Sequence, residues 1–420
     1  MRFLEALRSA FRIGDLRRRI FFTLWMFVVF RIGVYVPVPG VDSRAIADLV
    51  AEGTLFGLLD LFSGGALSAF SVFAMSITPY INASIIMQLL TVVIPRLEQL
   101  AKEGEEGRKK ITQYTRYATV GLAMVQAFGM SVGLRHAVVN PTFFGLSLIA
   151  LTLTAGTVFL MWLGEQITEK GIGNGISLII FAGIVSRAPQ GLATMWAYLT
   201  AGVLNIFNVA ILISIGLAAI AAVILVQEGQ RRVPVQYAKR VKGRRMYGGQ
   251  TTHIPVRINS AGVIPVIFST SVLAFPATIA QFIPHPWAQA VAGALGFRSA
   301  LYVTLNVMLI VFFTYFYTAI TFNPQNVAND LKKWGGFIPG LRPGRPTAEH
   351  LDRILYRITL IGAIFLAFVA AVMPTMVARI SGVNIYFGGT ALIIAVGVAL
   401  ETMKQIEVHL IMRHYQGFMR

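Results

Sequence analysis

Long apolar runs separated by short polar stretches dominate the pattern along this chain. A helix that crosses the hydrocarbon core of a bilayer needs about 20 predominantly apolar residues. The pattern predicts ten membrane-spanning helices, at residues 20–38, 71–94, 117–134, 148–163, 176–186, 209–226, 262–283, 301–322, 358–377 and 387–403. The fifth run is the shortest, and it reaches spanning length only if its helix continues past Pro189.

One apolar segment is too short to cross the membrane. Residues 58–70 (LLDLFSGGALSAF) contain Asp60 and are interrupted by Gly64 and Gly65, so we expect a re-entrant half-helix here. Non-helical backbone at membrane depth is tolerated only where protein or a water-filled cavity surrounds it. The next span carries several neutral polar side chains, Asn82 among them. Together they indicate a plugged aqueous path, as in a pore or a transporter.

The distribution of charge sets the topology. The chain of 420 residues is 56% hydrophobic and 13% charged, and its 36 Lys and Arg residues outnumber 18 Asp and Glu residues. A basic chain first suggests nucleic acid binding, but most Lys and Arg fall in alternate loops, at residues 1–19, 95–117, 168–175, 227–258, 324–357 and 401–420. Cytoplasmic loops concentrate these residues, so both termini are predicted to be cytoplasmic.

The spans divide into two halves. Residues 1–200 hold five spans and the short segment, and residues 201–420 hold five spans and two long basic loops, 227–258 and 324–357. Five spans per half force opposite orientations, which is the topological condition for inverted repeats. We therefore predict an all-α integral membrane protein, with ten transmembrane helices in two inverted five-helix halves plus a short re-entrant plug helix.

The two basic loops are larger than membrane orientation requires. Alternation in the first loop predicts a projecting hairpin around Lys242–Arg245, and the Pro- and Gly-rich residues 324–349 predict a protruding loop. Orientation and contact with anionic lipids explain the charge without a protein partner. Interleaved aromatic residues such as Tyr237 and Trp334 favour docking surfaces for a cytosolic partner.

Catalytic motifs are missing from the sequence. There is no His-Glu-x-x-His, no Gly-x-Ser-x-Gly, no P-loop and no cysteine. Residues 171–174 (GIGN) are similar to an aspartic protease motif, but Asn174 replaces the carboxylate and no second Asp can share a proton. Ion-coupled transporters place carboxylates or histidines at mid-membrane, whereas Arg31 is the clear ionisable residue within a predicted span. We predict neither an enzyme nor a bound cofactor or metal.

Residues 62–90, FSGGALSAFSVFAMSITPYINASIIMQLL, closely resemble the SecY family, the channel subunits of the bacterial protein translocase. The resemblance recurs at residues 102–117, 162–185, 229–240, 261–269, 323–344 and 386–394. It implies a clamshell of two halves around an hourglass pore in the bacterial cytoplasmic membrane. Unfolded secretory polypeptides are expected to cross through this pore, and membrane-protein segments to leave it laterally.

The resemblance also implies roles for individual residues. The plug is expected at Leu58, Phe62, Gly64, Gly65, Leu67 and Phe70. A pore ring is expected at Ile77, Ile81, Ile176, Ile180, Ile267 and Ile394. The lateral gate, between the second and seventh spans, is expected to carry a polar cluster of Asn82, Gln126 and Asn259. Docking to the cytosolic partner is expected at Arg231, Arg232, Lys239, Arg240, Arg244, Arg245 and Arg342.

Simpler roles remain open for several of these residues. A single isoleucine in a membrane helix is by itself more typical of lipid or core contact, and Gln126 also fits ordinary bonding between helices. An aliphatic ring excludes water and ions yet yields to a passing polypeptide, whereas a polar ring would leak. Ser76 stands where glycine is expected in many relatives, so packing at the hinge between plug and gate is expected to differ slightly.

The resemblance implies partners as well. These are the small membrane proteins SecE and SecG, the ATPase SecA or the ribosome at the basic loops, signal peptides and precursor polypeptides in the channel, and anionic lipids around it. Two other functions remain: a secondary transporter for a small solute, and a scaffold that anchors ribosomes. Sparse charge within the spans counts against the transporter. A scaffold would be insensitive to substitutions in the pore ring.

Overall fold

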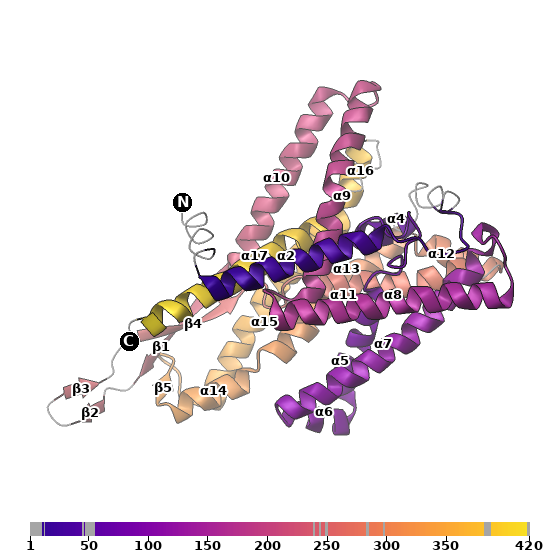
Figure 1. Cartoon of the computed structure of the whole chain (residues 1–420). Coiled ribbons are helices and arrows are strands. Elements are labelled where there is room, and N and C mark those ends of the chain that lie inside the picture. The colour runs from indigo at the N-terminus through magenta and orange to yellow at the C-terminus, as the bar shows by residue number, and fades with distance from the viewer. Residues whose placement is uncertain are drawn as a thin grey trace.

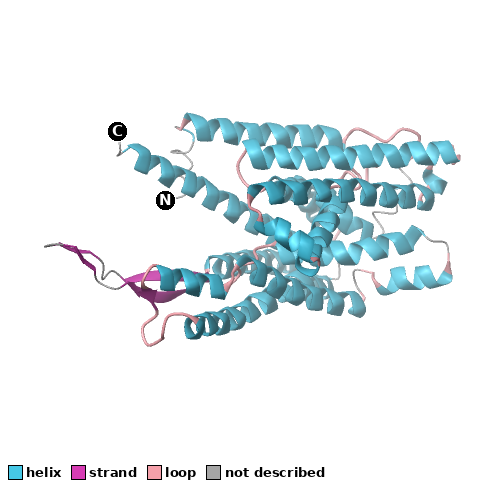
Figure 2. Ribbon diagram, turned by 90° about the horizontal axis from the view of Figure 1, so that it is seen from below, coloured by secondary structure: helices cyan, strands magenta, loops and turns pink. Residues whose placement is uncertain are grey.

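The computed structural model describes residues 11, 13–43, 46, 55–237, 240–242, 245–247, 251–282, 285–296, 299–381 and 388–417. Long helices dominate this part of the chain, and a small β element lies at one end of them (Figure 1, Figure 2). The helices of the first half are α2 (Gly14–Val34), α4 (Leu55–Ser63), α5 (Thr78–Val93), α6 (Pro95–Lys102), α7 (Glu105–Gly133), the 3₁₀ turn η1 (Arg135–Ala137), α8 (Phe143–Lys170) and α9 (Gly175–Thr200). Those of the second half are α10 (Ile206–Glu228), α11 (Ile264–Phe282), α12 (Pro286–Ala294), α13 (Ala300–Thr321), α14 (Pro324–Lys333), α15 (Arg345–Ala367), the π-helical turn η2 (Phe368–Val372), α16 (Met373–Ser381) and α17 (Gly389–Gly417).

Each of the ten predicted spans coincides at least in part with a helix of the described chain. Among the described residues, five helical stretches are long and apolar enough to cross a membrane by length and composition, and the count is six if α5 and α6, which meet at 99°, are taken as one span. Helices such as α2 and α7 carry charged residues at one end, which lowers their mean hydropathy. Helix α9 continues through Pro189 to Thr200, which supplies the length that its apolar run lacked.

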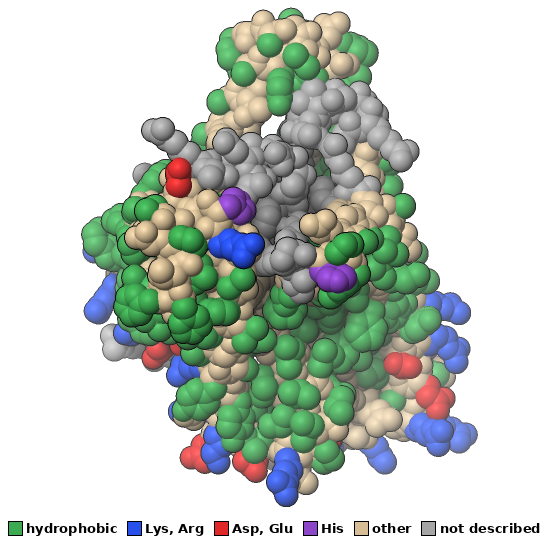
Figure 3. Space-filling view, turned by 90° about the vertical axis from the view of Figure 1, so that its right-hand side faces the viewer, with side chains coloured by type: hydrophobic (Ala, Val, Ile, Leu, Met, Phe, Trp, Pro, Cys, Tyr) green, Lys and Arg blue, Asp and Glu red, His purple; other side chains and the backbone are tan. Residues whose placement is uncertain are grey.

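The outer surface of the helices is apolar. Helix α10 has a mean hydropathy of 3.0 over its most apolar window, yet Leu217 and Leu225 on it are 63% and 72% exposed. Figure 3 shows hydrophobic side chains over the middle of one face and most of the charged side chains around the margins of its lower half. Soluble proteins rarely expose contiguous apolar patches of this kind, whereas lipid covers them in a membrane protein.

The helical part of the plug segment is shorter than predicted. Helix α4 ends at Ser63, so the half-helix expected over residues 58–70 is wrong in its length, and turns follow it. Gly64 and Gly65 take φ angles of +68° and +96°, the left-handed region that glycine enters without steric cost. A right-handed helix cannot continue through such residues, so the chain turns back at this point. The next helix starts only at Thr78, with Pro79 in its first turn.

The two basic loops fold into one unit, which we call the docking unit. Its strands are β1 (Gln230–Tyr237), β2 (Arg240–Lys242), β3 (Arg245–Tyr247), β4 (Thr251–Arg257) and β5 (Gly336–Phe337). Strand β1 pairs antiparallel with β4 on one side and with β5 on the other, and β2 pairs with β3. The first loop is therefore the predicted hairpin, and it projects from the helices in Figure 2. The second loop is more ordered than the protruding loop predicted, because it contains α14.

The main apolar core joins the two halves of the chain. Phe30, Phe73 and Leu160 of the first half share this core with Phe313 and Ile393 of the second. Helix α11 packs against α5 and α7 across the junction and against α13 within its own half. Helix α17 likewise packs against both α9 and α10. Five of the predicted ring isoleucines belong to this core: Ile77, Ile81, Ile180, Ile267 and Ile394.

One close backbone contact fixes the segment between the plug and α5. A Cβ at Gly156 of α8 would lie 1.8 Å from the carbonyl oxygen of Val72 and 3.5 Å from the Phe73 ring. Only glycine therefore lets α8 approach the backbone of this segment directly. The ring of Phe73 in turn lies against Gly33 of α2, where a Cβ would come within 2.0 Å of it.

Candidate functional site

Five of the six ring isoleucines surround one small cavity at the junction of the halves. The cavity has a volume of about 20 Å³, room for about one water molecule. Three of the five come from the first half and two from the second: Ile77, Ile81, Ile180, Ile267 and Ile394. All five side chains are buried. The structure thus brings together residues that lie more than 300 positions apart in the chain.

Ile176 is the ring residue that the structure leaves outside the lining of this cavity. It is half-buried in the first turn of α9, and its Cδ1 atom lies 2.6 Å from where a Cβ on Gly164 would be. The absent side chain at Gly164 makes room for it on α8. Residues four apart share a helix face, but Ile176 packs towards α8 whereas Ile180 reaches the cavity.

The surface of the cavity is apolar despite its hydroxyl residues. Thr270 lines it, but its Oγ1 donates within the helix to the carbonyl oxygens of Val266 at 3.0 Å or Ile267 at 2.9 Å. A narrow apolar constriction loses its water and blocks ions. The junction therefore encloses a small, mainly apolar cavity with room for about one water molecule.

The plug residues fall into two groups. Phe62 is half-buried and lines the cavity, so the plug helix contacts the isoleucine constriction directly. Leu67 and Phe70 are buried instead in a second apolar cluster that includes Met130 and Leu153 of the first half. Gly64 and Gly65 form the turn after α4, at 64–65. Leu58 belongs to α4, but its side chain lies outside the described part of the structure.

The three gate amides lie on elements that pack against one another. Asn82 is on α5, Gln126 is on α7, and Asn259 precedes α11, which contacts both helices. All three are buried, and Asn259 donates from Nδ2 to the carbonyl oxygen of Gly262 at 2.8 Å. Among the described residues, Asn82 Nδ2, Gln126 Oε1 and Asn259 Oδ1 have no hydrogen-bond partner. No hydrogen bond joins the three amides to one another in the described part of the chain.

The docking residues that the structure describes lie on the docking unit. Arg231 and Arg232 are exposed on β1, opposite Val256 and Pro255 of β4. Arg240 and Arg245 belong to β2 and β3, whereas Lys239 and Arg244 lie outside the described residues. Arg342 is exposed, and its carbonyl oxygen accepts a hydrogen bond from Thr347 Oγ1 at 2.8 Å. Arg231, Arg232 and Arg342 make no ion pair with any residue in the described ranges.

A separate apolar core holds the docking unit in shape. Val233 and Val235 of β1 pack with Val256 of β4, with Leu331 of α14 and with Leu351 of α15. Alternate residues of β1 therefore face this core, while Pro234 between the two valines and Arg232 before them are exposed. The unit presents its positive charges from a supported surface rather than from independent loops.

One group of polar residues was missed as a cluster at the level of sequence. Asp60 and Arg31 each stood out singly in the sequence without a predicted partner, and Arg187 lies directly after the apolar run 176–186, where the sequence leaves the end of the helix open. The structure continues α9 beyond Arg187, whose guanidinium forms an ion pair with Asp60 of the plug helix. The uncertain length of the fifth span concealed this contact.

The comparisons with known proteins agree with this geometry. Residues 71–403 match the family model described as SecY. The chain is 49% identical over 430 residues to the protein translocase subunit SecY of Halalkalibacterium halodurans, a match that covers 99% of this chain and all of the relative. It is 46% identical over 429 residues to the SecY subunit of Thermotoga maritima, with 99% and 98% of the two chains covered.

Solved structures share the fold at much lower identity. One, described as the structure of a protein conducting channel, has a TM-score of 0.65 and 18% identity over 93% of this chain and 91% of that one. Another is Sec61 in the canine ribosome-channel complex from the endoplasmic reticulum, with a TM-score of 0.61 and 17% identity over 93% and 91% of the two chains. At such identities, the likeness concerns the arrangement of the helices.

Proposed function

The chain belongs to the SecY family, and we propose that it is the protein-conducting channel of a translocase in the bacterial cytoplasmic membrane. It lets unfolded secretory polypeptides cross the membrane, and it releases the apolar segments of membrane proteins into the lipid. The protein is a channel and not an enzyme. The observation that carries the proposal is the cavity at the junction of the halves, lined by isoleucines from both of them.

In this function, the isoleucine ring closes the pore at rest and opens around a passing polypeptide. Branched aliphatic side chains close the pore against water and ions at rest, and they can move aside around a polypeptide without losing hydrogen bonds. Phe62 of the plug lies against the ring, so the plug supports the closed state from one side. Ile176 belongs to the pore only if α9 turns or shifts when the channel opens.

The gate amides help the channel to release apolar polypeptide segments into the lipid. The seam between α5 and α11 carries Asn82 and Asn259, with Gln126 of α7 beside them. A buried polar atom without a partner costs free energy, so these amides weaken the closed seam. An apolar signal peptide of a precursor polypeptide then opens the seam at a lower cost.

The docking unit binds the machinery that supplies the energy. Exposed Arg231, Arg232 and Arg342 lie free of ion pairs among the described residues, so they remain available to phosphates or carboxylates. The ribosome binds there during synthesis and the ATPase SecA binds after it. Support comes from one solved relative, which is a channel bound to a ribosome.

The remaining partners follow from membership of the family. SecE and SecG complete the membrane complex, and anionic lipids lie next to the basic loops. Both termini lie in the cytoplasm, as the docking unit does. The positive charge of these segments supports that orientation, because cytoplasmic loops concentrate Lys and Arg.

Reconstituted vesicles test the function. The chain, purified with the subunits that accompany it, is placed in vesicles with SecA, ATP and a labelled precursor protein. We expect the precursor to become protected from added protease, and to lose this protection when detergent opens the vesicles. Uptake of a small solute without SecA, and no protected precursor, would instead establish the transporter. Ribosome binding without any protected chain would establish the scaffold.

A further inference from the structure

The plug helix carries a charge that is almost completely removed from solvent. Asp60 of α4 is 4% exposed, and it forms an ion pair with Arg187 of α9. Asp60 Oδ1 also accepts a hydrogen bond from the backbone N–H of Ser68 at 2.7 Å. A buried carboxylate needs such partners, because leaving it unpaired is strongly destabilising. The plug therefore keeps this position only while both partners stay in place.

Arg187 binds the plug at several atoms. Its guanidinium donates to Ser68 Oγ at 3.0 Å and to Gln190 Oε1, and it lies 3.3 Å from where a Cβ on Gly65 would be. Glycine at 65 thus lets the guanidinium lie directly against the turn. Gln190, one turn further along α9, orients the guanidinium from its own helix.

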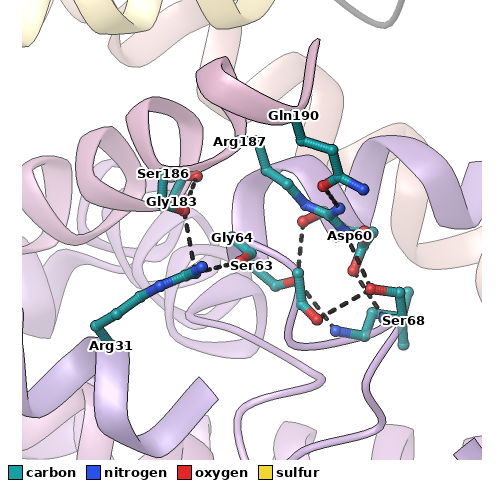
Figure 4. A network of polar contacts seen from close by, with 11 residues as sticks. Arg31, Asp60, Ser63, Gly64, Ser68, Gly183, Ser186, Arg187 and Gln190 are labelled. Carbon is teal, nitrogen blue, oxygen red and sulfur yellow. Dashed lines mark hydrogen bonds and ion pairs between the residues drawn. The ribbon is translucent and has the colours of Figure 1, made fainter. Parts of the chain in front are cut away.

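A second arginine holds the same turn from another helix. Arg31 of α2 donates from one nitrogen to the carbonyl oxygen of Gly64 at 2.8 Å and to Ser186 Oγ at 3.3 Å. Its other terminal nitrogen donates to Tyr35 Oη at 2.7 Å. Figure 4 shows the two guanidinium groups reaching the turn at residues 64–65 from different sides.

Backbone contacts complete the attachment to α9. A Cβ at Gly183 would lie 2.5 Å from the carbonyl oxygen of Phe62 and 3.2 Å from the N atom of Gly64. The plug and α9 are therefore in direct backbone contact at this position. Side-chain bonds and shape complementarity both fix the plug on the same helix.

The attachment is asymmetric with respect to the pore. In the described part of the chain, the side-chain hydrogen bonds and ion pair of the plug go to α2, to α9 or to the plug itself. Towards the second half, Phe62 lies at the cavity with Ile267 and Ile394. Apolar contacts of this kind can separate without leaving a charge unpaired. Breaking the Asp60–Arg187 pair, by contrast, leaves a buried charge without its partner.

We infer that Arg187 and Arg31 form a polar latch that fastens the plug to the first half of the channel, so that opening has two separable steps. The two halves part first along the apolar cavity, and the plug remains on α2 and α9. The plug leaves the path only when the Asp60–Arg187 pair breaks. This inference rests on the proposed channel function, and it assigns to Arg187 a positioning role that the family resemblance did not supply.

Resting ion leak tests the latch. The accompanying subunits and the chain are reconstituted in vesicles without precursor or motor, and ion permeability is measured for Arg187→Gln, for Asp60→Asn and for both changes together. Each single change is expected to raise the leak by about tenfold or more, because it leaves a buried charge without its partner. The double change is expected to leak less than the product of the single effects, because the two changes remove the same interaction.

A second readout follows the plug itself. The chain has no cysteine, so Ala69→Cys introduces one reactive thiol on the half-buried part of the plug segment. Labelling of this thiol by a maleimide is expected to speed up by a similar factor in the Arg187→Gln background. A purely structural ion pair would lower the thermal stability of the complex without changing the labelling rate.

The matched control is another pair between helices. Arg116 Nε of α7 lies 2.8 Å from Glu165 Oε1 of α8, and among the described residues neither side chain forms a hydrogen bond or ion pair with the plug. Arg116→Gln should leave leak and labelling unchanged. Leak and labelling at the wild-type level in all three latch variants would overturn the latch, provided that deletion of the plug segment does increase the leak. If that deletion also leaves the membrane tight, the channel proposal itself fails.

Discussion

Ser76 has a backbone conformation that its side chain disfavours. Its φ angle is +53°, in the left-handed region, and Phe70 at +41° is the other residue with a side chain that the described chain holds there. Such positions cost non-glycine residues free energy and persist where the surroundings enforce them. Ser76 lines the cavity directly before Ile77, so this conformation sets the direction in which the first ring isoleucine points.

Replacing Ser76 with glycine should therefore stabilise the closed protein. We expect Ser76→Gly to raise the free energy of unfolding by about 1 kcal/mol, which is the relief of a strained φ less the extra entropy of glycine. Thermal unfolding of the purified complex in detergent measures the change. Ser84→Gly, in the interior of α5, is the control and should destabilise by about 0.5 kcal/mol. Equal effects at the two positions would contradict the assignment of strain to Ser76.

At the scale of elements, glycines decide how closely the plug region packs. Gly156 of α8 meets the Val72 carbonyl, and Gly183 of α9 meets the Phe62 carbonyl. The two helices therefore contact the start and the middle of the turns between α4 and α5. Helix propensity alone gives no reason for these glycines, since each lies inside a long helix.

Adding one methyl group to α8 should displace this segment. Gly156→Ala is expected to destabilise by about 1–3 kcal/mol, because its Cβ would collide with backbone that cannot move aside freely. Gly216→Ala in α10 meets nothing within 4 Å and should be neutral or slightly stabilising. Thermal unfolding of both variants measures the two changes in stability. A neutral effect of Gly156→Ala would mean that α8 does not hold the segment as closely as described.

The gate seam is a second test at this scale. Asn82→Leu removes a buried amide donor without a partner, so it should favour the closed seam by about 1–3 kcal/mol. Precursors with weakly apolar signal sequences should then be translocated less efficiently than precursors with strongly apolar ones. Gln88→Leu, on the same helix, is the control. If Asn82→Leu translocates precursors with weakly and strongly apolar signal sequences as the wild type does, Asn82 has no role in the gate.

At the scale of the whole molecule, the two basic loops act as one surface. The pairing of β5 with β1 joins segments about 100 residues apart, and a shared apolar core lies beneath them. Arg342 lies in the second loop and Arg231 in the first, so their charges belong to the same docking unit. This surface lies at the same end of the molecule as α14 and the carboxyl-terminal part of α17 (Figure 1).

Reversing one charge on this surface should impair binding without unfolding the protein. Arg342→Glu is expected to weaken ribosome binding and to reduce the slope of log affinity against log salt by about one. Arg345→Glu is the control, because Arg345 already pairs with Glu349 at 3.0 Å. Titrations at several salt concentrations give both slopes. Normal binding and normal SecA-driven transport by Arg342→Glu would refute its docking role.

The sequence predicts the helices well because lipid demands long apolar runs, and these are visible without a structure. It does not predict which way Ile176 points, since that depends on the space left by Gly164 on α8. Nor does it reveal the partner of Asp60, because the apolar run of α9 ends before Arg187 although the helix continues. The two-residue strand β5 is also too short to be recognised from a pattern.

The central claim is that a polypeptide passes between the isoleucines of the two halves. The chain has no cysteine, so single cysteines can replace Ile81 and Ile267 at the cavity, and Leu217 and Leu225 on the exposed face of α10. A precursor with one cysteine is then stalled during transport, and disulfide formation is measured. We predict disulfides at the two cavity positions and none at the two positions on α10. Disulfides at all four positions, or at none while the precursor still crosses the membrane, would contradict the account.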